Sequence, residues 1–480
     1  MSFTTRGPEN DIESGPAKHG MNKNPDDSPS IDSTGKENTT DDAVFGEITE
    51  GGPNYRNVGW LGTVALMMKT QVGLGVLSIP AVFDTLGMIP GVICLLVIAS
   101  INTWSCYSIG TFKINHPEVY DISDVGFKLF GPIGRECFAA AFVLLLTFCT
   151  ASGMLSIAIS LNALSTHAVC TAVFVAIGWV IAFGCGSIQT LSRISALAWV
   201  GLVSIIVAIF TVTIAVGVQE RPYAAPQEGV WQSDYKLFAT PDFASASAAL
   251  SSLVFAYGAT PAFFSIVSEM REPRHYTRAL IISQVGMTTI YLVIGIVVYY
   301  YCGSYVASPA LGSAGPIVKR VSYGLALPGL IASTTLLTHY PAKYIFVRAL
   351  RNTRHLAANT KTHWVAWLSC TFGVSIVGYI IASAIPVFGG LISLIGALFA
   401  TLTSFQPMGF MWFYDNWSKG TVKGSRVKWM VMVGWAVFVI VAGTFLMIAG
   451  TYGSIVGIID SYKESGGSAA WSCADNSNSV

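Results

Sequence analysis

Charged residues are scarce in this sequence of 480 residues: Asp, Glu, Lys and Arg make up 11% of it, whereas soluble domains carry about 25%. None occurs from Cys137 to Ser192, from Ala279 to Val318 or from Thr362 to Tyr414. Such stretches have no polar stripe of the kind that soluble helices show, which excludes a large soluble core. Because a spanning helix needs about 20 apolar residues, the longer stretches hold two spans each. With a first span at about residues 59 to 83, the sequence predicts an all-α polytopic membrane protein with eleven transmembrane helices.

The predicted spans also lack the groups that other membrane functions need. No cluster of His, Asp and Glu occurs within a span, which argues against an enzyme. No helix repeats charged or carbonyl-rich positions, which argues against a channel. Gly73 and Gly75 lack the third glycine and the preceding strand of a dinucleotide site. We therefore expect no cofactor and no metal ion.

Residues 1 to 57 have the opposite composition, with eleven acidic and five basic residues and little apolar surface to bury. This predicts a disordered acidic tail before a transmembrane domain at 58–460 and a short tail at 461–480. The segment has no short apolar core of a signal peptide, so the first span should direct insertion. It is either a solvated tail or a regulatory segment in which Lys18, Lys23 and Lys36 are open to modification by trafficking or ubiquitination machinery.

Lysine and arginine are unevenly distributed over the predicted loops. Alternate loops hold 16 of them, whereas the opposite loops and the C-terminal tail hold 5. The positive-inside rule therefore predicts a cytosolic N-terminus and, with an odd number of spans, an extracellular C-terminus. Cys302 and Cys473 are both expected outside and are candidates for a disulfide, without support from their spacing.

Glycine and proline interrupt two of the apolar segments. Gly73, Gly75 and Pro80 fall within the first span, and Gly258 and Pro261 fall at the corresponding place five spans later. Glycine weakens a helix and proline removes a backbone donor, so both segments should unwind near the membrane centre. Unwound backbone survives there only where it is buried in protein or lines a cavity. Matched interruptions indicate the midplane site of an inverted-repeat transporter, although glycines that serve only helix packing give the same pattern.

Lys69 is the only ionisable residue between Arg56 and Asp84. It lies roughly 14 Å along the first span, counted from Trp60, and so near the bilayer centre. An ammonium at that depth should face the protein interior and have a partner or a task. The alternatives are a lysine that extends to the cytosolic face and a static ion pair.

Glu269 ends the sixth predicted span on the cytosolic side. One interpretation is a helix cap that pairs with Arg271 or Arg274. The other, which we take as a hypothesis, is that Lys69 and Glu269 both belong to the machinery that couples transport to an ion gradient.

Three groups of residues together resemble one known family, the amino acid/auxin permeases of the amino acid-polyamine-cation group. They are Val72–Pro80 (VGLGVLSIP), Ser268–Pro273 (SEMREP), and Leu391–Ala397 (LISLIGA) with Ser404–Pro407 (SFQP). The resemblance covers about residues 58 to 460 and is strongest to the neutral amino acid permeases of filamentous fungi, the methyltryptophan-resistance type. It implies a five-plus-five inverted repeat of the leucine-transporter kind with an eleventh helix, alternating access, and breaks in helices 1 and 6.

The resemblance also implies which residues bind the substrate. Free backbone N–H groups at the first break would hold the α-carboxylate, a role that carries over to Val72, Gly73, Leu74 and Gly75. Carbonyls and side chains at the second break would hold the ammonium and border the side-chain pocket, a role that carries over to Phe255, Ala256, Tyr257 and Gly258.

The sequence departs from the sodium-coupled members of the family at one position. Those members place an asparagine four residues before the first glycine of the motif, whereas this chain has Lys69 there, as the proton-coupled members do. A fixed ammonium can take the place of a bound cation, so proton symport is favoured over sodium coupling. Thr70, Thr334 and Thr335 lie in the regions that bind the cation in relatives, but their hydroxyls can equally bond to carbonyls of their own helices.

We therefore expect a secondary active transporter that imports neutral amino acids, aliphatic and aromatic, and the resemblance implies that it lies in the plasma membrane. The predicted pocket offers aromatic side chains, and no carboxylate lies at mid-depth to neutralise a cationic substrate. A transporter-like amino acid sensor and a vacuolar exporter of the same family are the alternatives.

Overall fold

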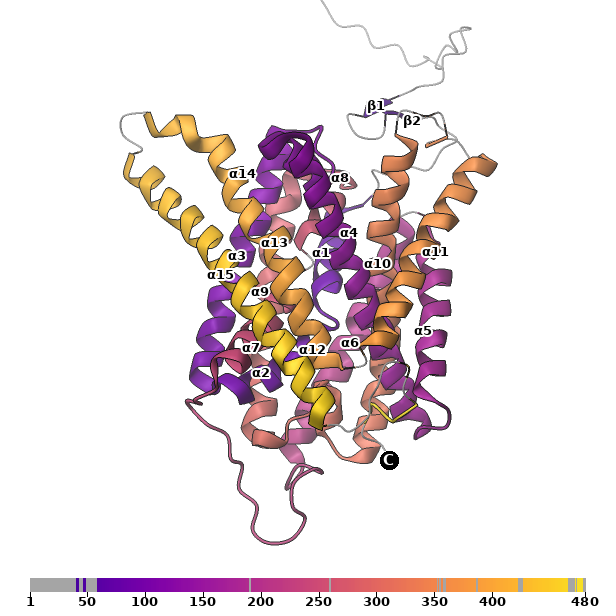
Figure 1. Ribbon diagram of the computed structural model, residues 1–480, viewed down its shortest axis with the longest axis vertical. Helices are drawn as coiled ribbons and strands as arrows, with labels where there is room; N and C mark the ends of the chain where they lie inside the picture. Colours follow the sequence, from indigo (N-terminus) through magenta and orange to yellow (C-terminus); the bar gives the residue numbers. More distant parts are fainter. Residues whose placement is uncertain are drawn as a thin grey trace, which may run out of the picture.

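The computed structural model describes residues 40–42, 46–48 and 58–477, apart from residues 190, 259, 352, 354, 357–359, 386, 422–425, 465–470 and 472. Ten helical segments within this part are long and apolar enough to cross a membrane (Figure 1). Seven of them are single helices: α3 (Met88–Asn115), α4 (Ile122–Ser165), α6 (Leu191–Val218), α9 (Tyr276–Cys302), α10 (Pro316–Leu350), α11 (Lys361–Ala384) and α15 (Arg426–Glu464). The expected all-α membrane fold is confirmed.

The other three long segments are discontinuous. The first consists of α1 (Trp60–Gln71), η1 (Gly75–Ser78) and α2 (Ile79–Leu86), and the second of α7 (Phe243–Ala256), η2 (Thr260–Ala262) and α8 (Phe263–Ser268). These are the two breaks that the glycines and prolines predict. The third segment was not expected to be irregular: α12 (Phe388–Leu394) continues through a π-helix, η6 (Ile395–Ala400), into α13 (Thr401–Ser404) and α14 (Gln406–Asn416).

The shorter elements connect these segments. Helix α5 (Thr171–Gly186) is apolar but has 16 residues, fewer than the about 20 of a full span, so the count of eleven stays a prediction that depends on α5. Strands β1 (Thr40–Asp42) and β2 (Gly46–Ile48) pair antiparallel, and they are the only part of residues 1–57 that is described. The remaining turns are η3 (Pro273–His275), η4 (Gly303–Tyr305), η5 (Ala310–Ser313) and η7 (Trp417–Thr421).

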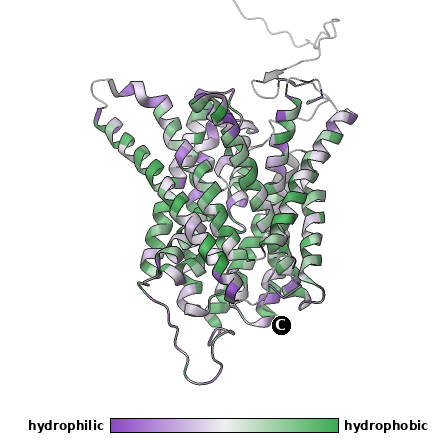
Figure 2. Cartoon of the chain, in the orientation of Figure 1, coloured by the Kyte–Doolittle hydropathy of each residue, from purple (hydrophilic) through white to green (hydrophobic). Residues whose placement is uncertain are grey.

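Burial separates the broken segments from the peripheral helices. In the most apolar windows of the first and second broken segments, 89% and 94% of the residues are buried, whereas the corresponding share is 17% in α15 and 33% in α11. Hydrophobic residues predominate along the middle of the helices and hydrophilic ones gather towards the two ends (Figure 2), and many large apolar side chains, such as those of Val180 and Val441, are exposed. The bundle is therefore apolar outside, and the broken helices lie at its centre.

Local sequence sets where several helices begin and bend. The Asp121 carboxylate accepts hydrogen bonds from the backbone N–H groups of Ser123 and Asp124 and so caps α4. Within α4, Gly131 has a φ of 68°, which a glycine adopts without steric cost, and the helix kinks there before Pro132. Asp242 caps α7 in the same way as Asp121 caps α4.

The loops after α3, α8, α10 and α14 lie at one end of the bundle, at the top of Figure 1. We call this the basic end, because Lys113, Arg271, Arg351 and Lys419 lie in or next to these loops. The N-terminus of α7 and the C-terminus of α15 lie at the opposite end. Helix α15 crosses the near face of Figure 1 diagonally and packs on α7 and α12.

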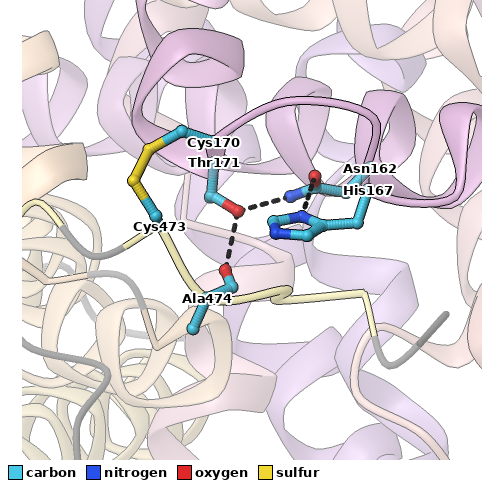
Figure 3. Close-up of a disulfide and its surroundings, with 6 residues drawn as sticks. All are labelled: Asn162, His167, Cys170, Thr171, Cys473 and Ala474. Carbon is cyan, nitrogen blue, oxygen red and sulfur yellow. Dashed lines mark hydrogen bonds between the residues drawn. A yellow bond between two sulfur atoms is a disulfide. The ribbon is translucent and has the colours of Figure 1, made fainter.

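The C-terminal residues 473–477 return to the opposite end of α4 and α5. Cys473 forms a disulfide with Cys170, and the Ala474 carbonyl accepts a hydrogen bond from the Thr171 hydroxyl at 2.7 Å (Figure 3). The suggested pairing of Cys473 with Cys302 is wrong, because Cys302 is a buried free thiol next to the Ser313 carbonyl. The spacing of the cysteines gave no indication that Cys170, 303 residues away, is the partner.

Replacement of Cys473 by Ser should lower the free energy of unfolding by about 2–4 kcal/mol, because the disulfide closes a very long loop of the unfolded chain. The measurement is the midpoint of thermal unfolding of the purified protein in detergent. Cys137→Ser changes an exposed free thiol and should leave the midpoint unchanged. Equal midpoints for the two variants would contradict the anchoring of the C-terminus by this disulfide.

Candidate substrate site

The two helix breaks meet at the centre of the bundle. Gly75, the first residue of η1, lies against Ala256, the last residue of α7. A Cβ added to Gly75 would lie 2.4 Å from the Ala256 Cα and 2.9 Å from the Ala256 Cβ. Only hydrogen fits at position 75, so the backbones of the two breaks are in direct contact.

Backbone donors at the first break are left without partners. The Val72 N–H still donates to the Met68 carbonyl at 2.6 Å, but in the described part of the chain the N–H groups of Gly73 and Leu74 donate no backbone hydrogen bond. They directly precede η1 and α2, and the N-terminal end of a helix favours negative charge. The break therefore offers free donors to an anion.

A small cavity of about 20 Å³ lies at the junction of the breaks. That is room for about one water molecule, so the site is closed around its centre in this structure. The Ser333 hydroxyl of α10 is buried, makes no hydrogen bond with a described residue and lies 2.5 Å from where a Cβ of Gly73 would be. The residues that line the cavity are Thr70, Gln71, Leu74, Gly75, Cys149, Phe255, Ser333 and Leu337.

The carbonyls of the second break already accept hydrogen bonds from the protein. The Ala256 carbonyl accepts from the Tyr291 hydroxyl at 2.9 Å, and the Tyr257 carbonyl accepts from the Gln71 amide at 3.0 Å. The Gly258 carbonyl is 3.5 Å from the Ser404 hydroxyl. The Ala256 and Gly258 carbonyl oxygens each have a second lone pair that can accept from a ligand, whereas the Thr260 hydroxyl lies 2.9 Å from the Tyr257 carbonyl and occupies its second side.

The side chains of the second break point to different places. Phe255 lines the central cavity, whereas the Tyr257 hydroxyl is hydrogen-bonded to Thr288 of α9 at 3.0 Å. The Tyr257 ring also packs edge to face on Tyr291, with 5.3 Å between the centroids. Phe255 is therefore the aromatic wall of the cavity, and Tyr257 contributes its backbone.

Lys69 is fully buried beside the first break. Its Nζ donates to the Val72 carbonyl at 3.1 Å, and its stem lies against Gly201 of α6. Among the described residues no carboxylate is within ion-pair distance of this amine. The structure therefore gives Lys69 neither the extension to the surface nor the static ion pair that were the alternatives to a functional role.

Glu269 is paired with a residue of α10. Its carboxylate binds the Nζ of Lys343, and both side chains are almost completely buried, with 2% and 5% of their surfaces exposed. The expected pairing with Arg271 or Arg274 is not the one found. Lys69 and Glu269 have different partners, and the Glu269–Lys343 pair holds α8 against α10.

The backbone next to this ion pair is fixed to the N-terminal end of α1. The Val58 N–H donates to the Glu269 carbonyl at 3.1 Å, and the Arg271 N–H donates to the Val58 carbonyl at 2.9 Å. The bridge uses the backbone carbonyl of Glu269, and the ion pair uses its side-chain carboxylate. Together they close the basic end around α8.

The hydroxyls of the predicted coupling residues bond within their own helices. Thr334 and Thr335 donate to the carbonyls of Leu330 and Ile331, each at 2.8 Å, and Thr70 donates to Leu66 at 2.6 Å. This is the second interpretation that the sequence left open for them. Thr70 also lies 3.5 Å from the Tyr340 hydroxyl of α10.

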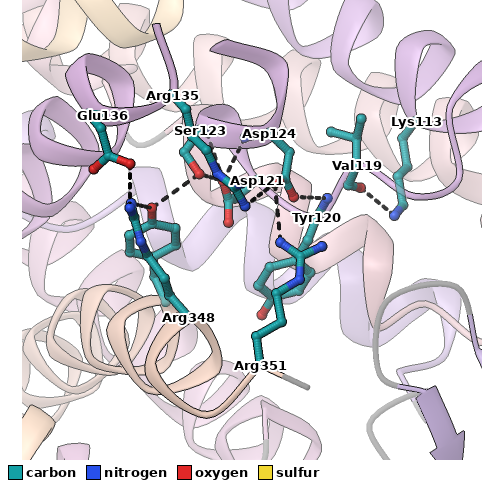
Figure 4. A network of polar contacts seen from close by, with 11 residues as sticks. Lys113, Val119, Tyr120, Asp121, Ser123, Asp124, Arg135, Glu136, Arg348 and Arg351 are labelled. Carbon is teal, nitrogen blue, oxygen red and sulfur yellow. Dashed lines mark hydrogen bonds and ion pairs between the residues drawn. The ribbon is translucent and has the colours of Figure 1, made fainter. Parts of the chain in front are cut away.

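A charged network joins α4 to the end of α10 at the basic end (Figure 4). Arg348 binds Glu136 at 2.5 Å, and Arg351 and Arg135 both bind Asp124, at 3.5 and 3.3 Å. Burial and the neighbouring carboxylate of Asp124 raise the pKa of Asp121 to about 6. The network fixes α4 to α10 where the chain leaves the apolar part of the bundle.

A larger cavity, of about 570 Å³, lies at the end opposite the basic end. It is bordered by α2, α7, α12 and α15, and its wall is rich in serine. It runs from Asp242 and Asp460 at the helix ends to Ser78 and Ser252 near the breaks. The two ends of the molecule therefore differ: one is closed by ion pairs, and the other is hollow.

Two residues that take part in these contacts were not recognised from the sequence. Lys343 is one of the 16 basic residues that the sequence predicts in alternate loops, but α10 continues to Leu350, so Lys343 lies inside the helix. Gln71 directly precedes the motif Val72–Pro80 of the first break. A side-chain amide such as that of Gln71 inside an apolar span could have indicated the break and the site, because such a group needs a hydrogen-bond partner at that depth.

Gly75→Ala should lower the free energy of unfolding by about 1–3 kcal/mol, because the methyl group of alanine would overlap with the Ala256 backbone. Gly373→Ala is the matched control: its Cβ would meet no atom within 4 Å, and alanine is the better helix former. Thermal unfolding in detergent measures both. An unchanged midpoint for Gly75→Ala would contradict the contact between the breaks.

Glu269→Gln should cost about 3–5 kcal/mol of stability, because it leaves the buried Lys343 ammonium without its counter-ion. Glu136→Gln removes the acid of the more exposed Arg348 pair and should cost less than about 1 kcal/mol. Adding Lys343→Met to Glu269→Gln should restore part of the loss. The idea of a buried pair fails if the two single variants unfold at the same temperature.

Solved structures with the same arrangement of helices include two transporters. One is a substrate-bound, outward-open sodium-coupled sialic acid symporter, with a TM-score of 0.52 and 11% identity over 84% of this chain and 91% of the other. The second is MhsT in complex with L-phenylalanine, with a TM-score of 0.51 and 14% identity over 84% and 98%. At this identity the likeness concerns the fold, and it confirms the expected leucine-transporter-like architecture.

Sequence relatives show the family. A transmembrane transporter of Fusarium pseudograminearum is 33% identical over 95% of this chain and 94% of its own length. The N amino acid transport system protein of Neurospora crassa is 32% identical over 89% and 91%. The model of the family "transmembrane amino acid transporter protein" matches residues 56–456. The chain therefore belongs to the transmembrane amino acid transporter family, and it is an amino acid transporter, as the motifs at the two breaks predict.

Proposed function

We propose that this transporter imports neutral amino acids, both aliphatic and aromatic, by alternating access and proton symport. The observation that carries the substrate class is the central cavity, because none of the described residues that line it is Asp, Glu, Lys or Arg. Such a wall has no group to neutralise a charged side chain. Leu74, Phe255 and Leu337 offer apolar surface to the side chain of the substrate instead.

The two charges of the amino acid itself are matched by backbone groups. The free N–H groups of Gly73 and Leu74, with Val72 and Gly75 beside them, would bind the carboxylate. Within residues 255–258, the carbonyls of Ala256 and Gly258 would accept from the ammonium with their remaining lone pairs. The substrate would then bridge the two breaks.

Lys69 is the proposed proton site. A lysine amine is positively charged when protonated and neutral when not. Binding and release of a proton at Lys69 would therefore add and remove a positive charge at the Val72 carbonyl, as binding and release of a cation would. The hydroxyl protons of Thr70, Thr334 and Thr335 are used for hydrogen bonds within their own helices. No sodium ion is needed in this scheme.

Alternating access would use the difference between the two ends. The substrate enters through the 570 Å³ cavity, and the Glu269–Lys343 pair with the Val58 bridge keeps the basic end closed. For release, α8 must move away from α10, which separates this pair. Glu269 would therefore couple opening of the basic end to the state of the site.

We also propose that the protein resides in the plasma membrane with the basic end in the cytosol and the C-terminus outside. The excess of lysine and arginine at the basic end supports this orientation. The disulfide of Cys473 lies at the other end, and disulfides persist on the oxidising side of a membrane. Residues 1–57 would then be accessible to cytosolic trafficking or ubiquitination machinery.

Proteoliposomes that contain the purified protein test the proposal. We expect uptake of radiolabelled phenylalanine and leucine, but not lysine, when an inward proton gradient is imposed, and no dependence on sodium. Lys69→Ala should abolish the response to the proton gradient, whereas Lys361→Ala, at an exposed position, should keep it. Uptake that is driven by sodium and indifferent to a proton gradient would overturn the coupling, and preferred uptake of lysine would overturn the substrate class.

A further inference from the structure

Four buried polar side chains from four elements surround the contact between the two breaks on the side of α3 and α9. They are Gln71 of α1, Asn102 of α3, Thr260 of η2 and Gln284 of α9, and 5%, 0%, 0% and 2% of their respective surfaces are exposed. We propose that these residues, which we call the amide ring, position the two breaks so that the substrate can bind between them. This inference rests on the proposed binding of the substrate at the breaks.

The hydrogen bonds of the amide ring form one continuous circuit that starts at the Tyr257 carbonyl and ends on the Thr260 hydroxyl. Gln71 Nε2 donates to the Tyr257 carbonyl at 3.0 Å, and Gln284 Nε2 donates to Gln71 Oε1 at 3.2 Å. Asn102 Nδ2 donates to Gln284 Oε1 at 3.2 Å, and the Thr260 hydroxyl donates to Asn102 Oδ1 at 2.6 Å. Thr260 Oγ1 also lies 2.9 Å from the Tyr257 carbonyl, but its single proton is directed to the closer acceptor, Asn102 Oδ1, so the circuit ends beside its starting point.

The direction of every bond in the circuit follows from one group. A backbone carbonyl can only accept, so Gln71 must turn its NH₂ group towards Tyr257 and its oxygen towards Gln284. Gln284 and Asn102 must then each present NH₂ to the preceding oxygen. The circuit can end only on a donor, and the hydroxyl of Thr260 is that donor. A residue that accepts but cannot donate therefore breaks the circuit at any amide position.

The elements joined by the amide ring also pack on one another. Helix α9 packs on α1 and α3, and η2 packs on α3. Tyr291 of α9 adds a second link between the breaks, because its hydroxyl lies 3.0 Å from the Gln71 carbonyl and 2.9 Å from the Ala256 carbonyl. The Gln71 and Tyr257 backbones are thus held from both sides, and the breaks keep one relative position.

Asn102, Gln284 and Thr260 are not among the residues that line the central cavity. They are positioning residues, which act on the substrate through Gln71 and the Tyr257 backbone. Their loss should weaken substrate binding without slowing the opening of the basic end, where the ring makes no contact. The expected signature is a raised KM with little change in maximal uptake rate.

Thr260→Val and Thr260→Ser are the matched pair that tests the proposal. Valine keeps the shape of threonine but removes the donor that ends the circuit, whereas serine keeps the donor and loses a methyl group. We expect Thr260→Val to raise the KM for phenylalanine uptake about tenfold, because it leaves a buried acceptor unpaired, and Thr260→Ser to stay within about threefold of the unsubstituted protein. The maximal rate per folded transporter should change less than about threefold in both.

Asn102→Asp is the second variant, and it is decisive where Thr260→Val is not recovered folded in detergent. An ionised aspartate has the shape of asparagine and still accepts from Thr260, but it cannot donate to Gln284, so we expect the same rise in KM at a pH at which the carboxyl is ionised. A KM unchanged in the recovered variant, or raised equally by Thr260→Ser, overturns the proposal. So does the recovery of Thr260→Ser with neither of the other two, because the ring would then be needed for folding and not for positioning. Absence of uptake by the unsubstituted protein would refute the proposed function instead.

Discussion

The structure depends on the contact of two unwound backbones inside a helix bundle. Where a helix breaks in an apolar environment, its backbone donors and acceptors lose their partners, and each must be bonded to something else in the protein. Gly75 and Ala256 bring two such segments together without intervening side chains. Most of the unusual contacts of the molecule supply hydrogen-bond partners for the backbone groups that the breaks expose, and a few of these groups are left available to a ligand.

These groups fall into two sets. The carbonyls of the second break and the end of the first are bonded by side chains such as Gln71 and Tyr291, which fix the geometry. In the described part of the chain, the N–H groups of Gly73 and Leu74 have no backbone partner, so they can bind an anion. In our proposal, the site for a zwitterion lies where one set is fixed by the protein and the other is left for the ligand.

Buried charged groups, like the exposed backbone groups of the breaks, need partners inside the protein, because burial of an unpaired charge costs free energy. The Glu269–Lys343 pair is enclosed completely, which compensates both charges, whereas Lys69 is enclosed with a carbonyl as its partner. A paired charge holds two elements together, and a charge without a counter-ion is suited to exchange its proton. The difference assigns the first to the closure of the basic end and the second to coupling in our proposal.

Much of this architecture can be predicted from the sequence, because long apolar stretches and matched Gly and Pro residues act locally. The charge-free segments determined the class of protein, Gly73 with Gly258 and Pro261 determined where helices break, and the family motifs determined the kind of transporter. These signals depend on the composition of one segment at a time. The positions proposed for substrate and coupling stay predictions, although the structure brings the two breaks together.

Only the tertiary structure decided which distant residues meet. The pairing of Glu269 with Lys343, of Cys170 with Cys473, and of Gln71 with Gln284 joins residues that are 74, 303 and 213 positions apart. The local sequence around one residue does not identify its distant partner. The rotation of each helix about its axis determines which side chains come within hydrogen-bond or ion-pair distance. That rotation is set by the packing of the whole bundle, and so is the π-helix of the third irregular segment.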